Sequence, residues 1–354
     1  MPLQNRDSGG QPLVSIIIPH WNGIKVLEEC LNSLKKTTYP NLEIIVVDNA
    51  STDGSPEWVE KNYPDIKLVR NSENKGYAGG CNRGAENASG DFLLFLNNDT
   101  VHEKDWIEPL VETMTSDEQT GAVQPKILNY FHRNTFDYAG GAGGEMDILV
   151  FPFARGRIFL TMEKDEGQYD DTVKIFWASG TAFMVKKDLF INAGKFDEMF
   201  FAHQEEIDLQ WRLQLMGYRI EAIPASVVYH KNAVTLPMHS FRKNYLNHRN
   251  SLFMLLTNYS LPMAVYLFPL RFALELVAVV YASVLLDFKH LGAIFKSLFW
   301  ILVHPVAIVR KRKAVKRLRK IRDREMVNNF YKGSVVMDYY IRKKKIYSDL
   351  GIPR

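Results

Sequence analysis

The first third of the chain alternates short apolar runs with amphipathic segments, and this alternation limits the fold more than any other feature. Strand-like apolar runs occupy residues 14–19, 42–48, 66–70, 92–96 and 121–127. Helix-like segments occupy residues 24–36, 55–62, 78–88 and 104–115. Strands that alternate with helices at this spacing predict βαβ units, right-handed crossovers and a mostly parallel sheet flanked by helices.

The pattern is weaker beyond residue 127. Residues 128–172 are rich in glycine, aspartate and aromatic residues, and we expect a loop with short strands there. Apolar runs at 174–179 and 182–186 predict a hairpin around Gly180 and Thr181. A helix is expected at 205–216, with Gly217 after its end, followed by short strands at 218–223 and 227–230.

Two apolar segments, 261–286 and 291–309, approach the length of a membrane-spanning helix. Arg271 and Glu275 interrupt the first segment four residues apart, where they could pair on one face. Ionisable groups are expensive in lipid, and prolines also interrupt both segments, so we expect interfacial or re-entrant helices rather than two full spans.

A basic run follows these segments directly. Residues 310–324 contain ten basic residues and one acidic residue, although the net charge of the whole chain is only +4. A solvated charged helix or a nucleic-acid-binding arm would also explain such a run. Its position beside apolar segments favours attraction to anionic lipid on the cytoplasmic face of a membrane, and we expect no nucleic-acid partner.

The two cysteines, Cys30 and Cys81, lie in expected helices without a partner at metal-ligand spacing, which indicates small buried apolar residues. This usage is consistent with a reducing compartment. The N-terminal 12 residues are polar, and the apolar run at 13–18 is too short for a signal peptide. We therefore expect the main domain on the cytosolic side.

The apolar run at 92–96 ends abruptly in Asn97, Asn98 and Asp99. Side chains just past a buried strand lie at the carboxyl edge of an open α/β sheet, where ligands bind. One carboxylate flanked by amides suits a hard divalent cation that also holds a diphosphate, although the same residues are common in turns.

Two further segments follow strand ends. Asp48 is followed by a turn rich in Ser, Thr and Asp; it could accept a hydrogen bond from a base or ribose, while the turn could simply cap the next helix. The glycine-rich segment 71–84 includes Asn74, Gly76 and Asn82 and would let the backbone approach a ligand closely. It is neither a P-loop nor the dinucleotide-binding fingerprint.

Three acids, Glu205, Glu206 and Asp208, open the helix expected at 205–216. Acids are favoured in a first helical turn by the helix dipole, which alone would explain Glu205. Two adjacent confined carboxylates also raise one another's pKa, which suits a general base. His230 follows a short strand; a lone histidine is usually structural but becomes a credible ligand beside a cation.

Taken in order, these motifs resemble the family 2 inverting glycosyltransferases of GT-A fold, in particular the rhamnosyltransferase-like branch that builds bacterial surface polysaccharides. The resemblance covers about residues 14–232. The matching segments are Ser15-Ile-Ile-Ile-Pro19-His-Trp21-Asn22, Val47-Asp48-Asn49-Ala-Ser-Thr-Asp53-Gly54, Asn74-Lys-Gly76-Tyr-Ala-Gly79-Gly80-Cys-Asn82, Leu96-Asn-Asn-Asp99-Thr100, Glu205-Glu206-Ile-Asp208-Leu and Tyr229-His230.

The resemblance implies a role for each matching residue. Donor contacts are implied at Pro19, Trp21 and Asn22 (nucleobase pocket), Asp48 (base), Asn74, Gly76 and Asn82 (nucleotide and diphosphate), and Asn98. Asn97 and Asp99 occupy the ends of the family's Asp-x-Asp motif, with Asp99 as the main ligand of Mg²⁺ or Mn²⁺, assisted by His230. Asn97 stands where the family has an acid, which implies weaker metal binding.

Glu206 matches the aspartate of the family's Glu-Asp motif, which is the catalytic base. It is longer than aspartate, so the choice between Glu205 and Glu206 stays open. Trp177 and Asp208 are expected on the acceptor side; a sugar could stack on the Trp177 indole, and core packing is the alternative explanation for this residue.

The implied domains are a polar tail at 1–13, a GT-A glycosyltransferase domain at 14–250, apolar membrane-associated helices at 251–309 and a basic tail at 310–354. The implied reaction moves a sugar from dTDP-rhamnose or a UDP-hexose to a hydroxyl of a glycan or lipid-linked oligosaccharide. We expect the protein at the cytoplasmic face of the inner (plasma) membrane, peripheral or re-entrant. The alternative is a non-catalytic membrane-associated polysaccharide-assembly subunit that keeps the fold. A sugar-phosphate nucleotidyltransferase would need a glycine-rich signature with Arg or Lys early in the chain, and residues 14–25 lack one.

Overall fold

A nine-stranded mixed sheet organises the protein. The computed structural model describes residues 10–231 and 240–352, so residues 1–9 of the expected N-terminal tail lie outside the described part. The strands follow the order β11-β13-β6-β12-β4-β1-β2-β3, and β5 pairs with β13. Their bounds are β1 Val14–His20, β2 Leu42–Asp48, β3 Lys67–Arg70, β4 Phe92–Leu96, β5 Thr100–His102, β6 Thr120–Asn129, β11 Val173–Ile175, β12 Ala182–Lys186 and β13 Arg219–His230.

The N-terminal half of this sheet is parallel, as the strand–helix alternation predicted. β1 pairs in parallel with both β2 and β4, and β2 pairs in parallel with β3. β12 then runs antiparallel between β4 and β6, and β13 runs parallel to β6. The carboxyl ends of β1 and β4 therefore lie side by side, which brings residues 19–21 next to residues 97–99.

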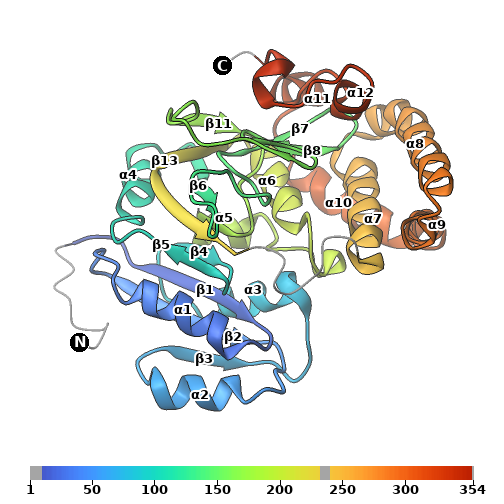
Figure 1. Ribbon diagram of the computed structural model, residues 1–354. Helices are drawn as coiled ribbons and strands as arrows, with labels where there is room; N and C mark the ends of the chain where they lie inside the picture. The colour runs from blue at the N-terminus through green and yellow to red at the C-terminus, as the bar shows by residue number, and fades with distance from the viewer. Residues whose placement is uncertain (1–9, 232–239, 353–354) are drawn as a thin grey trace.

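Helices cover both faces of the sheet (Figure 1). Successive residues of a strand point to opposite faces, and accordingly Ile16 and Ile18 join one apolar cluster while Ile17 joins the other. Cys30 and Cys81 are buried in these two clusters, one in each, as the sequence indicated. The helices that precede α7 are α1 Ile24–Leu34, α2 Ser55–Asn62, α3 Gly76–Asn87, α4 Glu108–Ser116, α5 Lys187–Asn192 and α6 Glu205–Leu215.

The expected hairpin between residues 174 and 186 is wrong. β11 is the edge strand of the sheet and pairs with β13, whereas β12 lies between β6 and β4 in the middle of the sheet. The two strands are therefore not neighbours. The expected strands at 218–223 and 227–230 are one strand, β13, whose register shifts between Ile223 and Val227. Pro224 explains the irregularity, because proline has no N–H to donate to a neighbouring strand.

The region expected to be a loop with short strands forms a small second sheet. Its order is β10-β9-β8-β7, and each pair is antiparallel. The bounds are β7 Gly144–Met146, β8 Pro152–Ala154, β9 Arg157–Ile158 and β10 Thr161–Met162.

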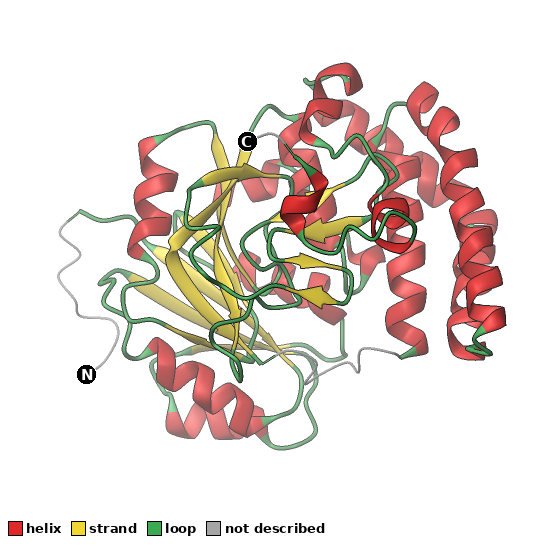
Figure 2. Ribbon diagram, turned by 45° about the horizontal axis from the view of Figure 1, so that its top comes forward, coloured by secondary structure: helices red, strands yellow, loops and turns green. Residues whose placement is uncertain are grey.

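The C-terminal third is helical. In Figures 1 and 2, α8 stands at the edge of the molecule away from the main sheet, with α7 between them. By length and composition α8 could cross a membrane, and α9 with α10, which are bent by 73° relative to each other, could form a second, broken span. The bounds are α7 Phe241–Asn258, α8 Leu261–Val284, α9 Phe288–Val303, α10 Pro305–Leu318, α11 Asp323–Met326 and α12 Val335–Tyr340.

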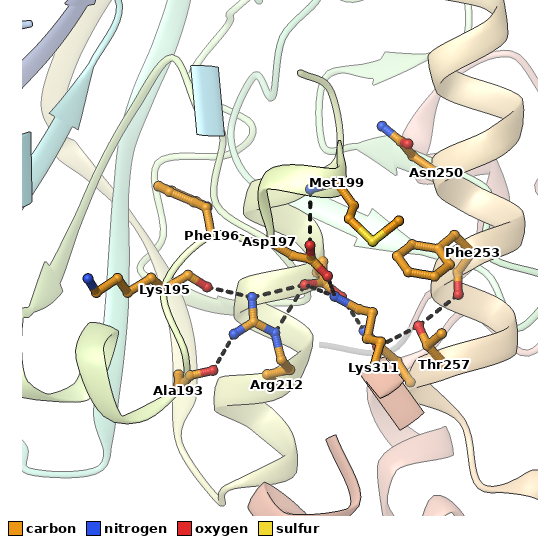
Figure 3. Close-up of polar contacts among 12 residues, drawn as sticks. Ala193, Lys195, Phe196, Asp197, Met199, Arg212, Asn250, Phe253, Thr257 and Lys311 are labelled. Carbon is orange, nitrogen blue, oxygen red and sulfur yellow. Dashed lines mark hydrogen bonds and ion pairs between the residues drawn. The ribbon is translucent and has the colours of Figure 1, made fainter. Parts of the chain in front are cut away.

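A buried ion cluster holds α10 against α6 (Figure 3). The ammonium of Lys311 lies 2.8 Å from the carboxylate of Asp208 in α6 and 2.7 Å from that of Asp197. Arg212 lies 2.9 Å from the same Asp208 carboxylate. Lys311 belongs to the basic run that the sequence predicted to contact anionic lipid. In the structure it is buried and forms ion pairs within the protein instead.

Candidate active site

A cavity of about 1560 Å³ opens at the carboxyl ends of β1 and β4. Asp99, just after β4, and Glu206, in the first turn of α6, both line it. The two carboxylates that the sequence singled out, 107 positions apart (206 − 99), therefore face one common space. Residues of α7, α8 and α12 also line this cavity.

The segment after β4 is held in place from several sides. The backbone N–H of Asn97 donates to the carbonyl oxygen of Thr181, and the side-chain amide of Asn98 lies 2.8 Å from Nδ1 of His20. Asp99 Oδ1 lies 3.1 Å from Nε2 of His230, at the end of β13. These contacts turn three consecutive side chains at a strand end toward one wall of the cavity.

His230 lies between two carboxylates. Its Nε2 contacts Asp99, and its Nδ1 lies 2.9 Å from Oδ1 of Asp137. Burial alone would lower the pKa of His230, but the charges of Asp99 and Asp137 outweigh it and raise this pKa to about 10. The same contact with His230 holds the pKa of the Asp99 carboxyl below its ordinary value, against the effect of burial.

The donor set at this strand end fits a divalent cation. Asp99 and Asn97 supply a carboxylate and an amide oxygen. His230, whose Nε2 lies 3.1 Å from Asp99 Oδ1 and 3.5 Å from the Asn97 amide nitrogen, would add an imidazole nitrogen only in its neutral form, after the cation displaces the proton that its raised pKa retains. Among the described residues, no group of three or more His, Cys, Asp or Glu side chains is arranged to hold a metal. Mg²⁺ is commonly bound by one or two carboxylates together with substrate phosphates and water, so a full cage of protein ligands is not required.

The approach to α6 is strained. Phe201, His203 and Gln204 adopt positive φ angles of 64°, 67° and 71° immediately before Glu205. Non-glycine residues in this conformation cost free energy and collect at functional sites, where the surrounding structure holds them. Gly76 has φ 68°, and a Cβ atom there would lie 2.3 Å from the Phe201 carbonyl oxygen, so only glycine allows this approach.

The two adjacent glutamates differ in exposure and in protonation. Glu205 is buried, and burial together with the neighbouring Glu206 charge raises its pKa well above the ordinary value. Glu206 is partly exposed to the cavity, and burial raises its pKa to about 7. One carboxyl oxygen of each residue has no hydrogen-bond partner among the described residues.

Most of the predicted donor residues come together at one end of the cavity. Pro19, Trp21, Asn74, Gly76, Asn98 and Asp99 line it, and the Trp21 ring is 44% exposed. Asn22, Asp48 and Asn82 do not appear in its lining. The Asn22 amide oxygen accepts from the Thr52 N–H, Asp48 accepts from the Ser51 N–H, and Asn82 bonds to the backbone of Phe196.

The predicted acceptor residues have different outcomes. Trp177 lines the cavity, but it is only 4% exposed and its indole N–H donates to the carbonyl oxygen of Glu145. The expectation for Asp208 is wrong: its side chain is fully buried and is held by Arg212, Asn258 and Lys311, so no acceptor reaches it. Helical periodicity explains this, because Asp208 lies two residues after Glu206 and so on another face of α6.

Several cavity residues were missed in the sequence. His20 contacts Asn98, and Tyr138, Arg157 and Lys243 line the cavity beyond the glutamates. Arg157 lies in a two-residue strand with no readable periodicity, and Lys243 lies in a helix of mixed composition. His20 could have been found, since it ends the first strand beside Pro19.

Comparisons with known proteins agree with this geometry. Residues 15–193 match the family described as Glycosyl transferase family 2, and the chain belongs to this family. An N-acetylglucosaminyl-diphospho-decaprenol L-rhamnosyltransferase of Mycobacterium tuberculosis is 26% identical over 221 residues, covering 58% of this chain and 72% of that protein. The O-antigen biosynthesis protein RfbC of Myxococcus xanthus is 31% identical over 234 residues, covering 63% of this chain and 18% of that protein.

The fold also matches solved structures. A crystal structure of GalNAc-T7 with UDP, GalNAc and Mn²⁺ aligns with a TM-score of 0.50 at 18% identity, covering 62% of this chain and 44% of that chain. The fold class expected from the sequence, a GT-A sheet with appended C-terminal helices, is therefore confirmed. The protein is a glycosyltransferase that uses a nucleotide sugar.

Proposed function

We propose that the enzyme is an inverting glycosyltransferase that moves a sugar from a nucleoside-diphosphate sugar to a hydroxyl of a glycan or lipid-linked oligosaccharide. The observation that supports this most strongly is the shared cavity of Asp99 and Glu206. One end of the cavity holds groups suited to a nucleotide diphosphate, and the middle holds a carboxyl suited to take a proton.

The donor enters between Trp21 and the segment after β4. Trp21 and Pro19 offer apolar surface to the base, and the diphosphate lies toward Asn98 and Asp99. A divalent cation, held by Asp99, Asn97 and His230, would neutralise charge on the leaving diphosphate. dTDP-rhamnose is the first donor to consider, because one similar protein is named as a rhamnosyltransferase; UDP-hexoses come next.

Glu206 acts as the general base. Its carboxylate takes the proton of the acceptor hydroxyl while the hydroxyl oxygen attacks the anomeric carbon from the face opposite the diphosphate. The new C–O bond forms as the bond to the diphosphate breaks, and the nucleoside diphosphate leaves with the bonding electrons. The anomeric configuration inverts, and positioning of the two reactants supplies much of the rate.

Of the two glutamates, Glu206 is better suited to this role. A base must be ionised near neutral pH and must reach the acceptor, and Glu206 has a pKa of about 7 and faces the cavity. Glu205 is buried, and its pKa is raised well above the ordinary value, which disfavours the ionised form that a base needs. We assign Glu205 to supporting the first turn of α6.

We place the enzyme on the cytoplasmic face of the membrane, attached through α8 and α9. Large apolar side chains of these helices point outward and are unusually exposed; they include Val265, Leu270, Val280, Val284, Phe295, Phe299 and Leu302. Arg271 and Glu275 instead pair with each other on the inner face of α8, 2.7 Å apart. A helix with one apolar outer face suits the bilayer interface.

A donor panel tests the proposed reaction. Purified enzyme is incubated with dTDP-rhamnose, UDP-glucose, UDP-galactose, UDP-N-acetylglucosamine and GDP-mannose, with MnCl₂ or with EDTA. We expect release of nucleoside diphosphate from one donor class, lost in EDTA. Asp99→Asn should remove the metal-dependent part of nucleotide-sugar binding, measured by calorimetry, because it removes the only carboxylate of the expected ligand set. Absence of release from every donor, or metal titrations unchanged in the variant, would contradict the proposal.

A further inference from the structure

Two buried cations face the cavity beyond the glutamates. Arg157 of β9 and Lys243 of α7 line it and are only 7% and 8% exposed. Both lie against the ring of Tyr138, with Arg157 Cζ 4.5 Å and Lys243 Nζ 5.1 Å from its centroid. Two positive charges from distant parts of the chain are thus gathered around one aromatic ring.

Neither cation has a carboxylate partner in the described part of the chain. Arg157 donates from Nη1 to the Phe159 carbonyl oxygen at 3.3 Å, and its buried Nε has no hydrogen-bond partner there. Asp137 is an acid whose charge influences both; its Oδ1 is hydrogen-bonded to His230, which it shares with Asp99, and its Oδ2 has no hydrogen-bond partner there, so it offsets one of the two charges at most. The undescribed residues 232–239 contain no Asp or Glu.

Of the four acids that line the cavity, Glu206 alone is left to offset these charges, and with a pKa of about 7 it does so only in part. Asp99 is paired with His230, and Glu275 is paired with Arg271 and His248. Glu205 is buried, and burial together with the Glu206 charge raises its pKa well above the ordinary value, which disfavours its ionised form. A buried charge without a counter-ion is costly, so this part of the cavity suits an anion supplied by a ligand.

The contacts on either side of Arg157 and Lys243 show which parts of the cavity these two residues lie between. On one side, the Ser179 hydroxyl donates to the Ala139 carbonyl at 2.5 Å, which joins the Tyr138 segment to the loop beside Glu206. On the other side, the Phe159 ring lies 5.1 Å from Tyr339 and 5.5 Å from Tyr340 of α12. Tyr340 in turn lies 6.2 Å from Tyr281 of α8.

The part of the cavity beside α8 and α12 is largely apolar, although Arg271, Glu275 and Lys343 also line it. It is lined there by Val277, Ala278 and Tyr281 of α8 and by Met337 and Ile341 near α12. These contacts place the paired cations between the loop beside Glu206 and the apolar residues of α8 and α12. A lipid diphosphate-linked sugar has its groups in the same order: sugar hydroxyl, phosphates, lipid.

We propose that Arg157 and Lys243 form a phosphate-binding subsite for the acceptor, and that the acceptor is a lipid diphosphate whose chain leaves along α8 and α12. The inference rests on the proposed function, since it names the acceptor class of the same site. Guanidinium and ammonium groups bind phosphate strongly through charge-assisted hydrogen bonds. The donor diphosphate has its own charge partner at the Asp99 end.

Binding of farnesyl diphosphate tests the subsite without any sugar or donor. Calorimetry compares farnesyl diphosphate with farnesol in EDTA, for wild type, Arg157→Gln and Lys243→Gln. The matched control is Lys174→Gln, which removes one exposed charge on β11 outside the cavity. We expect farnesyl diphosphate to bind wild type and control at least about tenfold more tightly than farnesol, and each cavity variant to lose about tenfold or more.

The donor side provides the second arm of this experiment. Binding of UDP and dTDP with MnCl₂ should change by less than about twofold in Arg157→Gln and Lys243→Gln. The reason is that salt and water screen the interaction between these side chains and a nucleotide diphosphate bound at the Asp99 end. Weakened nucleotide binding with normal farnesyl diphosphate binding would assign the cations to the donor and overturn the inference. Equal binding of farnesol and farnesyl diphosphate, or variants equal to the control, would also overturn it.

Two checks separate this test from folding and from catalysis. Arg157→Lys keeps the charge and should recover part of the farnesyl diphosphate binding, and melting temperatures identify any variant that does not fold. Glu206→Gln should bind farnesyl diphosphate as wild type does. Normal farnesyl diphosphate binding without transfer from any donor would contradict the proposed function alone, whereas transfer without farnesyl diphosphate binding would contradict this inference alone.

Discussion

Glu206 combines the three properties that a general base needs in this cavity. It faces the ligand space, one of its oxygens has no hydrogen-bond partner among the described residues, and burial raises its pKa to about 7. An efficient base has a pKa near the working pH, since it must be ionised before the reaction and must hold the proton afterwards. Its neighbour Glu205 lacks the exposure, and burial with the Glu206 charge raises its pKa well above the ordinary value.

The raised pKa of Glu206 predicts a pH dependence of kcat/KM. Because the base is active only when ionised, kcat/KM should rise with pH up to about 7 and level off above it. At pH 5, two units below this pKa, about one Glu206 side chain in a hundred is ionised, so kcat/KM should be about a hundredfold below the plateau. Initial rates at saturating Mn²⁺ measure this profile, and nucleotide binding measured at each pH is the control. A flat profile between pH 5 and pH 8 would exclude Glu206 as the titrating base.

At the scale of elements, β4 and α6 deliver the two carboxylates, and sequence reasoning found both. The apolar run at 92–96 and the acid-rich helix start at 205 are local signals, which periodicity and turn chemistry make visible. The partners of β11 and β12 are long-range contacts, so the expected hairpin was wrong although the strands themselves were found. Arg157 and Lys243 were missed for the same reason, since only tertiary packing gathers them around Tyr138.

The helix α10 is held to α6 by the buried cluster of Lys311, Asp208 and Arg212, and this predicts a stability effect. Burial alone would raise the pKa of Asp208, but the Lys311 and Arg212 charges hold it below the ordinary value. Removing one partner of a buried ion pair leaves an uncompensated charge, so Lys311→Met should lower the free energy of unfolding by about 3 kcal/mol. Urea denaturation followed by circular dichroism measures this change.

A double-mutant cycle provides the control for this cluster. Adding Asp208→Asn to Lys311→Met should cost less than the sum of the single substitutions, because the second removes the charge that the first left unpaired. Lys313→Met, two positions along the same basic run, is the matched single variant on an exposed site. A loss below about 1 kcal/mol for Lys311→Met would show that α10 is not fastened in this way.

At the scale of the whole molecule, the C-terminal helices form part of the ligand cavity. α7 and α8 contribute side chains to the cavity, including Lys243, His248 and Arg271, so a boundary near residue 250 crosses the site. Figures 1 and 2 show α8 at the outer edge of the molecule, where its exposed side carries the apolar residues. One helix therefore joins the ligand cavity to the surface proposed to meet the membrane.

The apolar face of α8 predicts binding to lipid vesicles. Wild-type protein should float with vesicles containing anionic phospholipid, and Val280→Asp should reduce the bound fraction several-fold, because a charge on this face must be desolvated in the interface. Val280 is 62% exposed, so the substitution leaves the core intact. Ile191→Asp in α5, 43% exposed on another side of the molecule, is the matched control and should float normally. Equal flotation of the two variants would place the membrane contact elsewhere.

The central claim is that the side chains of residues 99 and 206 act on one sugar across one cavity, and the Glu206→Gln variant tests it most directly. Glutamine keeps the size of the side chain but cannot take a proton, so transfer should fall by about 10²–10⁴-fold, the usual contribution of a general base. Nucleotide-sugar binding with Mn²⁺ should stay within about twofold of wild type, because the donor lies at the Asp99 end of the cavity. A transfer rate above about a tenth of wild type, with normal binding, would contradict the account.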